Sequence, residues 1–477
     1  MFFYGDGLSV GYQLSDSTRE VLKMEKQLTK HQYLILGSLL FGLFFGAGNL
    51  IFPIHLGQLS AHNWAPSALG FLLSAILLPL LAILAISLTR SSSVYDLALP
   101  VGRKFALFFL ILIHATLGLL VASPRTATVT YSIGIQPLLP KSLDHMGLLI
   151  FSLIYFGIAF ALSYNQSKVT DYVGKLLNPI LLILLAFIFL MAFVIKGDLR
   201  QINLLPAATG ATSNLVNGFL QGYNTMDALA GLGFGVTIIT ALKLFGVQKA
   251  GARSKAVAKV GAISMGLEAI IYIFLIALGA ASLKYLHLSD NGGTAFTQIM
   301  QHYTGLAGTA ILGAVTFLAC ITSCIGMLTS LSQDWGRRFP KLGYHFFLTM
   351  TSIGAFLIAN FGLDQIILYS TPLLSLIYPI AMALIILGLL TPVLGKQPLI
   401  YRTTVGLTLI PAVLDFIHTL PPYFAQMRFF SGIDGWASQY IPFYKLGLDF
   451  FPFMLIGLVG GWLLVLALKR TTVLAQH

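Results

Sequence analysis

Charged side chains are scarce in this chain of 477 residues: Asp, Glu, Lys and Arg make up 9% of it, whereas hydrophobic residues make up 57%. Soluble domains carry roughly 25% charged residues, so the composition excludes an ordinary soluble protein. The 28 basic residues outnumber the 16 acidic ones, but they are dispersed among apolar segments, and we expect no nucleic-acid partner. We predict an all-α integral membrane protein whose solvent is the lipid bilayer.

Cysteine and the common catalytic motifs are also scarce or absent. The two cysteines, Cys320 and Cys324, are one helical turn apart within an apolar segment, a spacing poor for a disulfide and too few ligands for structural zinc. The chain has no His-Glu-x-x-His run and no phosphate-binding glycine loop ending in Lys-Ser/Thr, which argues against a zinc enzyme and an ATP-driven pump. We expect no enzymatic activity, no cofactor other than a coupling cation and no obligate protein partner.

Long apolar segments dominate what is present, and a membrane span needs about 20 such residues. Twelve segments qualify: 33–54, 66–88, 104–131, 147–164, 175–195, 214–245, 256–283, 307–332, 343–361, 370–394, 400–419 and 448–468. Residues 284–304 are polar and glycine-rich, which predicts an external loop with one short helix. Residues 421–447 are rich in proline and aromatic side chains, which predicts a helix lying at the membrane interface.

The spans divide the chain into four regions. Residues 1–30 lack the apolar core of a signal peptide and predict a cytoplasmic tail, with Met24 as an alternative start of translation. Residues 31–197 would hold the first five helices and residues 198–395 the next five. Residues 396–477 would add two further helices and a cytoplasmic C-terminus.

The distribution of Lys and Arg predicts which side of the membrane each loop faces, because cytoplasmic loops carry an excess of both. With the N-terminus inside, the outer loops hold only Lys141, Lys196, Arg200, Lys284, Arg428 and Lys445. The remaining loop residues of this type fall inside, among them the cluster Lys243, Lys249, Arg253, Lys255 and Lys259. Both termini are therefore predicted to be cytoplasmic, in the cell membrane.

The first span contains Gly46-Ala47-Gly48-Asn49 near its middle. Each interior glycine costs a helix about 1 kcal/mol relative to alanine, so the run favours unwound backbone. Unwinding here would free N–H groups at the start of an outer half-helix, which favour an anion such as a carboxylate. The alternative is close helix packing, since Gly42 and Gly46 have the small-xxx-small spacing of membrane interfaces.

The sixth span contains a second glycine-rich stretch, Gly222 to Gly235, which includes Asp227 and alternating glycines from Gly231 onward. A carboxylate and freed backbone are both costly in lipid. Interruptions in corresponding positions of two halves are typical of secondary transporters with inverted repeats. We therefore predict broken first and sixth helices, in a five-plus-five inverted repeat.

The eighth span carries Ala319, Thr322 and Ser323 on one helical face, because they are three and four residues apart. A carbonyl and two hydroxyls are hard oxygen ligands that suit sodium together with carbonyls of the first break. The alternative is that both hydroxyls donate back to carbonyls of their own helix.

Several of these runs resemble one transporter family. Residues 31–53, Pro124-Arg125-Thr126, Gly222-Tyr223 with Thr225-Met226-Asp227, and Tyr378-Pro379-Ile380 are similar to the signatures of the branched-chain amino acid:cation symporters. The resemblance runs in order from about Tyr33 to the C-terminus. It implies the broken-helix (LeuT-like) fold of the amino acid–polyamine–cation superfamily, and it implies leucine, isoleucine or valine as substrate.

A more distant similarity to the neurotransmitter:sodium symporters implies residue roles. Gly46-Ala47-Gly48-Asn49 would bind substrate, with the amides of Ala47 and Gly48 on its carboxylate. The amino group and side chain would lie against residues of the second break, namely Ala228, Leu229, Gly231 and Phe234. The carbonyls of Gly42 and Phe45, with Ala319, Thr322 and Ser323, would form a sodium site. Leu43 stands where those symporters have an asparagine for a second sodium, so the comparison implies one coupling cation.

Three charged residues lie within predicted spans: Arg125 in the third, Asp227 in the sixth and Glu268 in the seventh. An arginine at membrane depth needs a partner, and the two carboxylates are the candidates. Their pairing could form and break as a gate during transport, or it could be permanent and structural. Glu268 could also carry a proton, because burial favours the neutral form of a carboxyl group.

The sequence thus predicts a secondary active importer of branched-chain amino acids, coupled to Na⁺ or H⁺. Transport of another small neutral amino acid and obligatory exchange are open alternatives. A channel is less favoured, since no regularly spaced polar residues line several spans.

Overall fold

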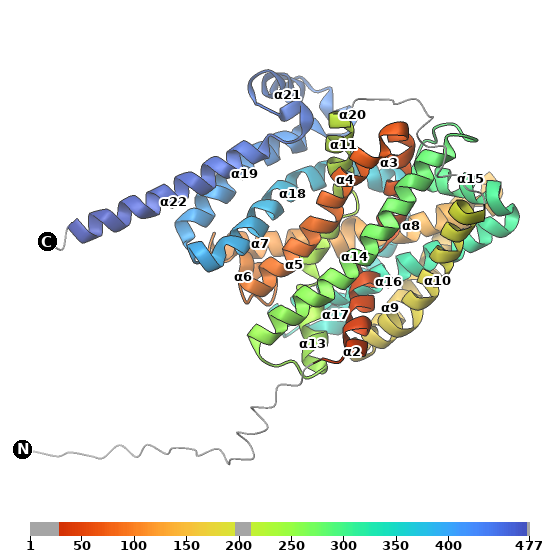
Figure 1. The fold of residues 1–477 in the computed structure, drawn as a ribbon, viewed down its shortest axis with the longest axis horizontal. Helices are drawn as coiled ribbons and strands as arrows, with labels where there is room; N and C mark the ends of the chain where they lie inside the picture. Colours follow the sequence, from red (N-terminus) through yellow and green to blue (C-terminus); the bar gives the residue numbers. More distant parts are fainter. Residues whose placement is uncertain (1–27, 196–210, 475–477) are drawn as a thin grey trace, which may run out of the picture.

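The computed structural model describes residues 28–195 and 211–474, which fold into helices with no strand in that part of the chain (Figure 1). Most of the predicted N-terminal tail, including Met24, lies outside the described residues. The junction of the two predicted repeats also lies outside them. The helices of the first half are α2 (Lys30–Phe44), α3 (Ala47–Ser60), α4 (Trp64–Leu72), α5 (Leu78–Leu88), α6 (Val94–Ala98), α7 (Arg103–His114), α8 (Ala122–Gly134), α9 (Asp144–Ser163) and α10 (Asn178–Phe189).

The second half is helical as well. Its helices are α11 (Ala211–Tyr223), α12 (Asp227–Gly233), α13 (Gly235–Leu244), α14 (Ala250–Ser282), α15 (Gly292–Thr304), α16 (Leu306–Arg338), α17 (Gly343–Ala359), α18 (Leu363–Leu394), α19 (Pro398–His418), α20 (Pro422–Ala425), α21 (Arg428–Tyr440) and α22 (Phe450–Leu474). The short helix predicted within 284–304 is α15, and the helix predicted within 421–447 is α21.

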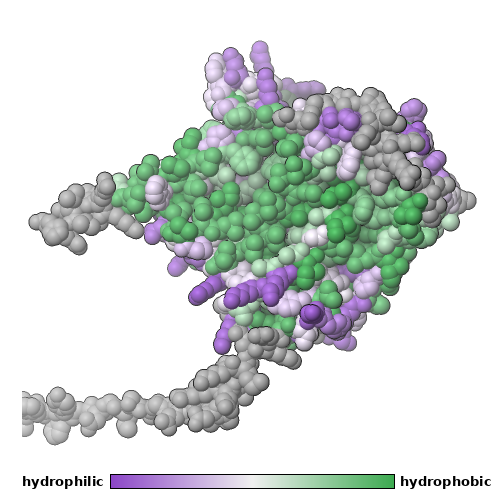
Figure 2. Space-filling view, viewed as in Figure 1, coloured by the Kyte–Doolittle hydropathy of each residue, from purple (hydrophilic) through white to green (hydrophobic). Residues whose placement is uncertain are grey.

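The molecule has the surface of a multi-pass membrane protein. Figure 2 shows a broad hydrophobic band across the helices, with hydrophilic side chains gathered along two opposite edges. Nine helical stretches of the described chain are long and apolar enough to cross a membrane, or ten if the bent pair Ser213–Gly233 and Thr237–Leu244 is one span. α2 with 15 residues and α17 with 17 are shorter than those stretches, so the count of twelve spans stays a prediction.

The first span consists of two helices joined by extended backbone. α2 ends at Phe44, Phe45 has φ −71° and ψ 96°, and Gly46 has φ −128° and ψ −155° before α3 begins at Ala47. Neither conformation continues a helix. The chain therefore leaves the helical path for two residues among buried neighbours, which puts a helix end and a helix start at the same depth.

The sixth span is interrupted twice. α11 ends at Tyr223, and Met226 has a left-handed conformation with φ 64° immediately before α12. A non-glycine residue in this region is strained and persists only where its surroundings hold it. A second irregularity at Phe234 separates α12 from α13, and the two halves of the span are bent by 48°.

Glycines let the neighbouring helices approach both interrupted spans closely. A Cβ atom at Gly57 of α3 would collide with the Ile276 carbonyl of α14, and one at Gly218 of α11 would collide with the Ser67 carbonyl of α4. Small residues at such crossings are the usual means of tight packing in membranes. The outer half-helices α3 and α11 are thus held against α14 and α4, which fixes the positions of the two breaks.

Candidate functional site

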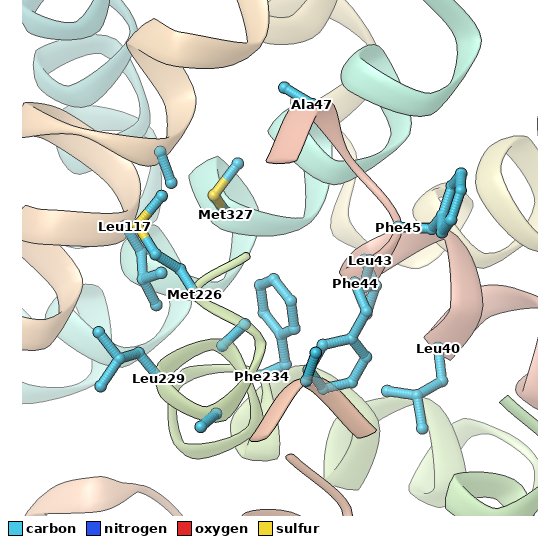
Figure 3. Packing of buried hydrophobic residues seen from close by; sticks show 14 of the residues in the cluster. Leu40, Leu43, Phe44, Phe45, Ala47, Leu117, Met226, Leu229, Phe234 and Met327 are labelled. Carbon is cyan, nitrogen blue, oxygen red and sulfur yellow. The ribbon is translucent and has the colours of Figure 1, made fainter. Parts of the chain in front are cut away.

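A small cavity lies between the two breaks. Its apolar lining residues are Leu117, Met226, Ala230, Phe234 and Met327 together with Leu43 and Phe44. Figure 3 shows labelled members of this set from α2, from the two residues that flank α12 and from α16 around the same space, with the Phe44 and Phe234 rings close together. Those two rings meet edge to face at 5.4 Å.

The lining also includes polar groups. They come from Gly46 and the first turn of α3 to Asn49, from Arg125 and Thr126 of α8, from Thr225 and Asp227, and from Ser323 of α16. The cavity is therefore lined by apolar side chains together with one cationic and one anionic side chain. This distribution suits a small zwitterion with an apolar side chain.

Asn49 connects the two breaks to each other. Its Oδ1 accepts the Gly46 N–H at 3.0 Å, and its Nδ2 donates to Asp227 Oδ2 at 2.8 Å. Nδ2 also contacts the hydroxyl of Tyr272 on α14, and that hydroxyl donates to Asp227 Oδ2 at 2.8 Å. All three side chains are at most 1% exposed. The buried Asp227 carboxylate is thereby solvated by two donors of the protein rather than by water.

Arg125 lies at the edge of the cavity with its side chain only partly satisfied. Nη2 donates to the Asn224 carbonyl in the second break at 2.8 Å, and the guanidinium lies over the Phe52 ring at 5.3 Å. Nε has no hydrogen-bond partner among the described residues, although Arg125 is only 3% exposed. No ion pair joins Arg125 to Asp227 or Glu268 in the described chain, so the predicted pairing is absent in this conformation.

The start of α3 presents backbone donors next to Arg125. The first N–H groups of a helix have no partner within the helix, and only that of Gly46 is taken by Asn49. A Cβ atom at Gly48 would lie 2.7 Å from Arg125 Nη2 and 3.1 Å from the Asn224 carbonyl. Glycine is thus the residue that lets the guanidinium come up to the helix start.

The hydroxyls of α16 differ from each other. Ser323 Oγ reaches across to α2 and contacts the Leu43 carbonyl at 2.9 Å and the Phe44 carbonyl at 3.3 Å. Thr322 Oγ1 turns back to the Leu318 and Ala319 carbonyls of its own helix, each at 3.0 Å. Of the predicted sodium ligands, Ser323 is therefore at the first break, where its partners are the carbonyls of Leu43 and Phe44 rather than those of Gly42 and Phe45.

Gly42 has another role in the packing. A Cβ atom there would collide with the side chain of Asn178 on α10, which agrees with the close-packing alternative for this glycine. Gly42, Phe45, Ala319 and Thr322 do not line the cavity. Their assignment to a cation site stays a prediction.

Glu268 is buried on α14, one helical turn before Tyr272. Its Oε1 accepts from Ser264 at 3.4 Å, and its Oε2 has no partner among the described residues. The Tyr272 hydroxyl donates to Asp227, so one side chain connects the turn that carries Glu268 with the second break. No ion pair joins Glu268 to Arg125 in the described chain.

The predicted substrate residues divide into two groups. Gly46, Ala47, Gly48, Asn49 and Phe234 line the cavity, whereas Ala228, Leu229 and Gly231 do not. Gly231 faces Pro79 and Ala82 of α5.

Sequence reasoning did not single out Leu117, Tyr272 and Met327. Tyr272 could have been found, since it lies four residues after Glu268 and so shares its helical face. The two apolar residues carry no signal that separates them from the rest of the core.

The fold has a counterpart among solved structures. A structure of Mhp1, a transporter of the nucleobase-cation-symport-1 family in a closed conformation with bromovinylhydantoin bound, aligns with a TM-score of 0.55. The alignment covers 88% of this chain and 96% of that chain at 14% sequence identity. Because the identity is so low, the likeness extends to the fold alone.

The sequence is similar to that of several bacterial permeases. The chain is 40% identical to the branched-chain amino acid permease BrnQ of Lactobacillus delbrueckii subsp. lactis over 89% of its own length and 95% of the relative's. It is 37% identical to the branched-chain amino acid permease BraB of Bacillus subtilis (strain 168) over 93% and 97% of the two chains. Residues 29–468 match the sequence model of a family described as branched-chain amino acid transport protein. With relatives named as permeases and a match over nearly its whole length, the chain is a transporter rather than an enzyme and belongs to the branched-chain amino acid transport protein family.

Proposed function

We propose that the protein is a secondary symporter that imports leucine, isoleucine and valine by alternating access around the cavity between the two breaks. The observation that carries this proposal is the lining of that cavity, which combines apolar side chains with one cationic and one anionic side chain. The names of the relatives, BrnQ and BraB, support the class of substrate. The dense Lys and Arg loops support cytoplasmic termini in the cell membrane.

The substrate carboxylate would lie between the first turn of α3 and Arg125. The N–H groups of Ala47 and Gly48, which have no partner within α3 at a helix start, and the unpartnered Nε of Arg125 would donate to the carboxylate there. The ammonium would lie near Asp227, whose charge is held by Asn49 and Tyr272. The branched side chain of the substrate would then lie beside the apolar lining residues Met226, Phe234 and Met327.

The coupling ion in this proposal is a single sodium. Ser323 Oγ and the Leu43 and Phe44 carbonyls already converge at the end of α2. A sodium ion there would be coordinated by these three oxygens, in place of the hydrogen bonds that the hydroxyl now donates to the carbonyls. Leu43 offers no side-chain oxygen for a second ion. Protons are the second candidate, because Glu268 is fully buried with one oxygen unpartnered in the described structure.

Uptake into proteoliposomes tests both the substrate and the ion. Saturable accumulation of leucine, isoleucine and valine under an imposed sodium gradient, with none under an imposed pH gradient, is the expected result. Accumulation under the pH gradient alone would move the coupling to Glu268. Gradient-independent flux would favour a channel, and uptake that requires internal amino acid would favour an exchanger.

The two hydroxyls of α16 should respond differently to substitution. Because only Ser323 reaches the carbonyls of α2, Ser323→Ala should raise the sodium concentration for half-maximal uptake by about tenfold, as expected for one lost ligand of about 1.4 kcal/mol. Thr322→Ala is the matched control and should shift it by less than about threefold. Equal shifts, or no shift in either variant, would count against this sodium site.

The apolar residues that line the cavity should determine which sizes of substrate side chain are transported. Met327→Ala enlarges the cavity, so phenylalanine uptake should rise, while leucine affinity should fall by several-fold because contacts are lost. Met300→Ala removes the same side chain from buried packing in α15 and should leave the preference for leucine unchanged. If the preference for leucine over phenylalanine is unchanged in Met327→Ala as well as in Met300→Ala, Met327 is not part of the substrate pocket.

A further inference from the structure

A second cavity lies where α5 ends and where α13 and α14 begin. It shares no lining residue with the cavity between the breaks. Two arginines, Arg90 and Arg253, line it together with Ser87, Ser91 and Ser254, and apolar residues of α5, α13 and α14 form the rest of the wall. No carboxylate side chain lines this cavity. The site is therefore polar, cationic and remote from the proposed transport pathway.

Neither guanidinium has a counter-charge. In the part of the chain that the structure describes, Arg90 and Arg253 form no ion pair and no side-chain hydrogen bond. Arg338 shows the contrast, because it has Asp334, the Ser93 hydroxyl and the Tyr95 ring as partners. Two like charges that line one cavity repel each other, and an anion between them would turn the repulsion into attraction.

The start of α14 increases the preference for an anion. Arg253 lies in its first turn, which contains no acidic residue, and the positive end of the helix dipole disfavours a cation there. The Lys396 ammonium donates to the carbonyl of Thr89, the residue before Arg90, at 2.8 Å.

The walls of this cavity are tied to one another. Ser254 Oγ on α14 donates to the Ser87 carbonyl at the end of α5 at 3.1 Å. Ser91 Oγ lies 2.8 Å from Thr89 Oγ1 in the turn that follows α5. These hydroxyls are therefore held in one place before any ligand arrives, which lowers the entropic cost of binding one.

The chemistry of the donors indicates the class of ligand. Planar guanidinium groups match the oxygens of phosphate, and basic pockets between membrane helices on the cytoplasmic side bind anionic head groups. Leu88, next to the lining residue Ser87, is 45% exposed, so apolar surface adjoins the charged cavity. Leu244, at the far end of α13, is 62% exposed. Hydrophilic side chains gather along the edge of the molecule where α13 ends and α14 begins (Figures 1 and 2).

We propose that this cavity binds the phosphate of an anionic phospholipid, with Arg90 and Arg253 on its oxygens and the acyl chains along Leu88 and Leu244. In the predicted orientation the lipid belongs to the inner leaflet. A bound head group joins α13, the inner half of the sixth span, to α5 and α14. The lipid is thus a structural ligand of the protein.

The test measures thermal unfolding of the purified full-length protein in phosphatidylcholine nanodiscs while phosphatidylglycerol is titrated. Wild type should be stabilised, and Arg90→Gln/Arg253→Gln should lower the apparent affinity for phosphatidylglycerol by about tenfold or more. The matched control, Lys243→Gln/Lys255→Gln, removes two exposed charges from α13 and α14 outside the cavity and should lower it by less than about threefold. An equal loss in both variants means general surface attraction and overturns the site.

Two further arms complete the experiment. If the double variant fails to fold, the single variants Arg90→Lys and Arg253→Lys provide the test. Each keeps the charge but loses the planar guanidinium, so each should have an affinity for phosphatidylglycerol between that of wild type and complete loss. Inorganic phosphate added to phosphatidylcholine nanodiscs should not stabilise the wild type. Stabilisation by free phosphate without an effect of phosphatidylglycerol would overturn the lipid assignment, and no response to either ligand would overturn the proposal. Because no transport is measured, a failure here is distinct from a failure of the proposed function.

Discussion

Gly48→Val should abolish leucine uptake, with binding reduced by about 100-fold or more. The new side chain would enter space where a Cβ atom already lies 2.7 Å from Arg125 Nη2 and 3.1 Å from the Asn224 carbonyl. It would cover the free N–H groups of α3 and displace the guanidinium from the second break. The loss of two charge-assisted hydrogen bonds, at about 1.5–3 kcal/mol each, accounts for an effect of this size.

The control for this variant is Gly266→Val. Gly266 lies on α14, and a Cβ atom there would have no neighbour within 4 Å, so the same substitution should leave uptake close to wild type. Gly48→Ala adds a single carbon and should give an intermediate defect. Equilibrium binding of radiolabelled leucine to purified protein, with size-exclusion elution as a check of folding, provides the measurement. Normal leucine affinity in a well-folded Gly48→Val protein would refute the carboxylate site at α3.

Arg125→Ala should weaken both leucine binding and transport, and it should remove the discrimination between leucine and leucinamide. The guanidinium approaches the start of α3 and has one donor unpartnered in the described structure. If that donor binds the substrate carboxylate, wild type should prefer leucine over the uncharged amide by at least about tenfold. The variant should bind the two compounds about equally.

Two other outcomes separate this role from its alternatives. Retained leucine binding with lost transport would favour a gate in which Arg125 pairs with Asp227 or Glu268 in another conformation. Weaker binding of both compounds with the preference for leucine intact would favour a structural role, because the Asn224 carbonyl would then have lost its buried donor. Arg125→Lys retains a charge and should recover part of the preference for leucine only if the carboxylate is the partner.

The helical architecture and the positions of most helices could be predicted from the sequence, because the apolar segments between 33 and 468 are long and are separated by polar residues. Gly46 and Gly48 indicated where the first span departs from helical geometry, since glycine lowers helix stability locally. The left-handed backbone at Met226 could not be predicted, because nothing about methionine favours it. That conformation is imposed by packing around the second break.

Only part of the candidate site could be predicted from the sequence. The contacts that could not be predicted all depend on how separate helices pack. Residues of the first break depend on local backbone geometry, and they line the cavity, whereas their contact with substrate stays a prediction. Gly231 and Arg125 depend on which face of a helix meets which neighbour, and the sequence did not specify this. Gly231 packs on α5, and Arg125 faces Asn224 instead of a carboxylate. The Asn49–Asp227 hydrogen bond spans 178 residues of sequence, a separation at which local patterns carry no signal.

α14 is a single uninterrupted helix of 33 residues, and its length has a consequence for both proposed ligands. Arg253 near one end and Tyr272 beside Asp227 are separated by roughly 28 Å at 1.5 Å per residue. A stiff rod of this kind moves as a lever, so a tilt at one end displaces the other. Bilayer composition should consequently alter the affinity for amino acid, although no phospholipid comes near the substrate.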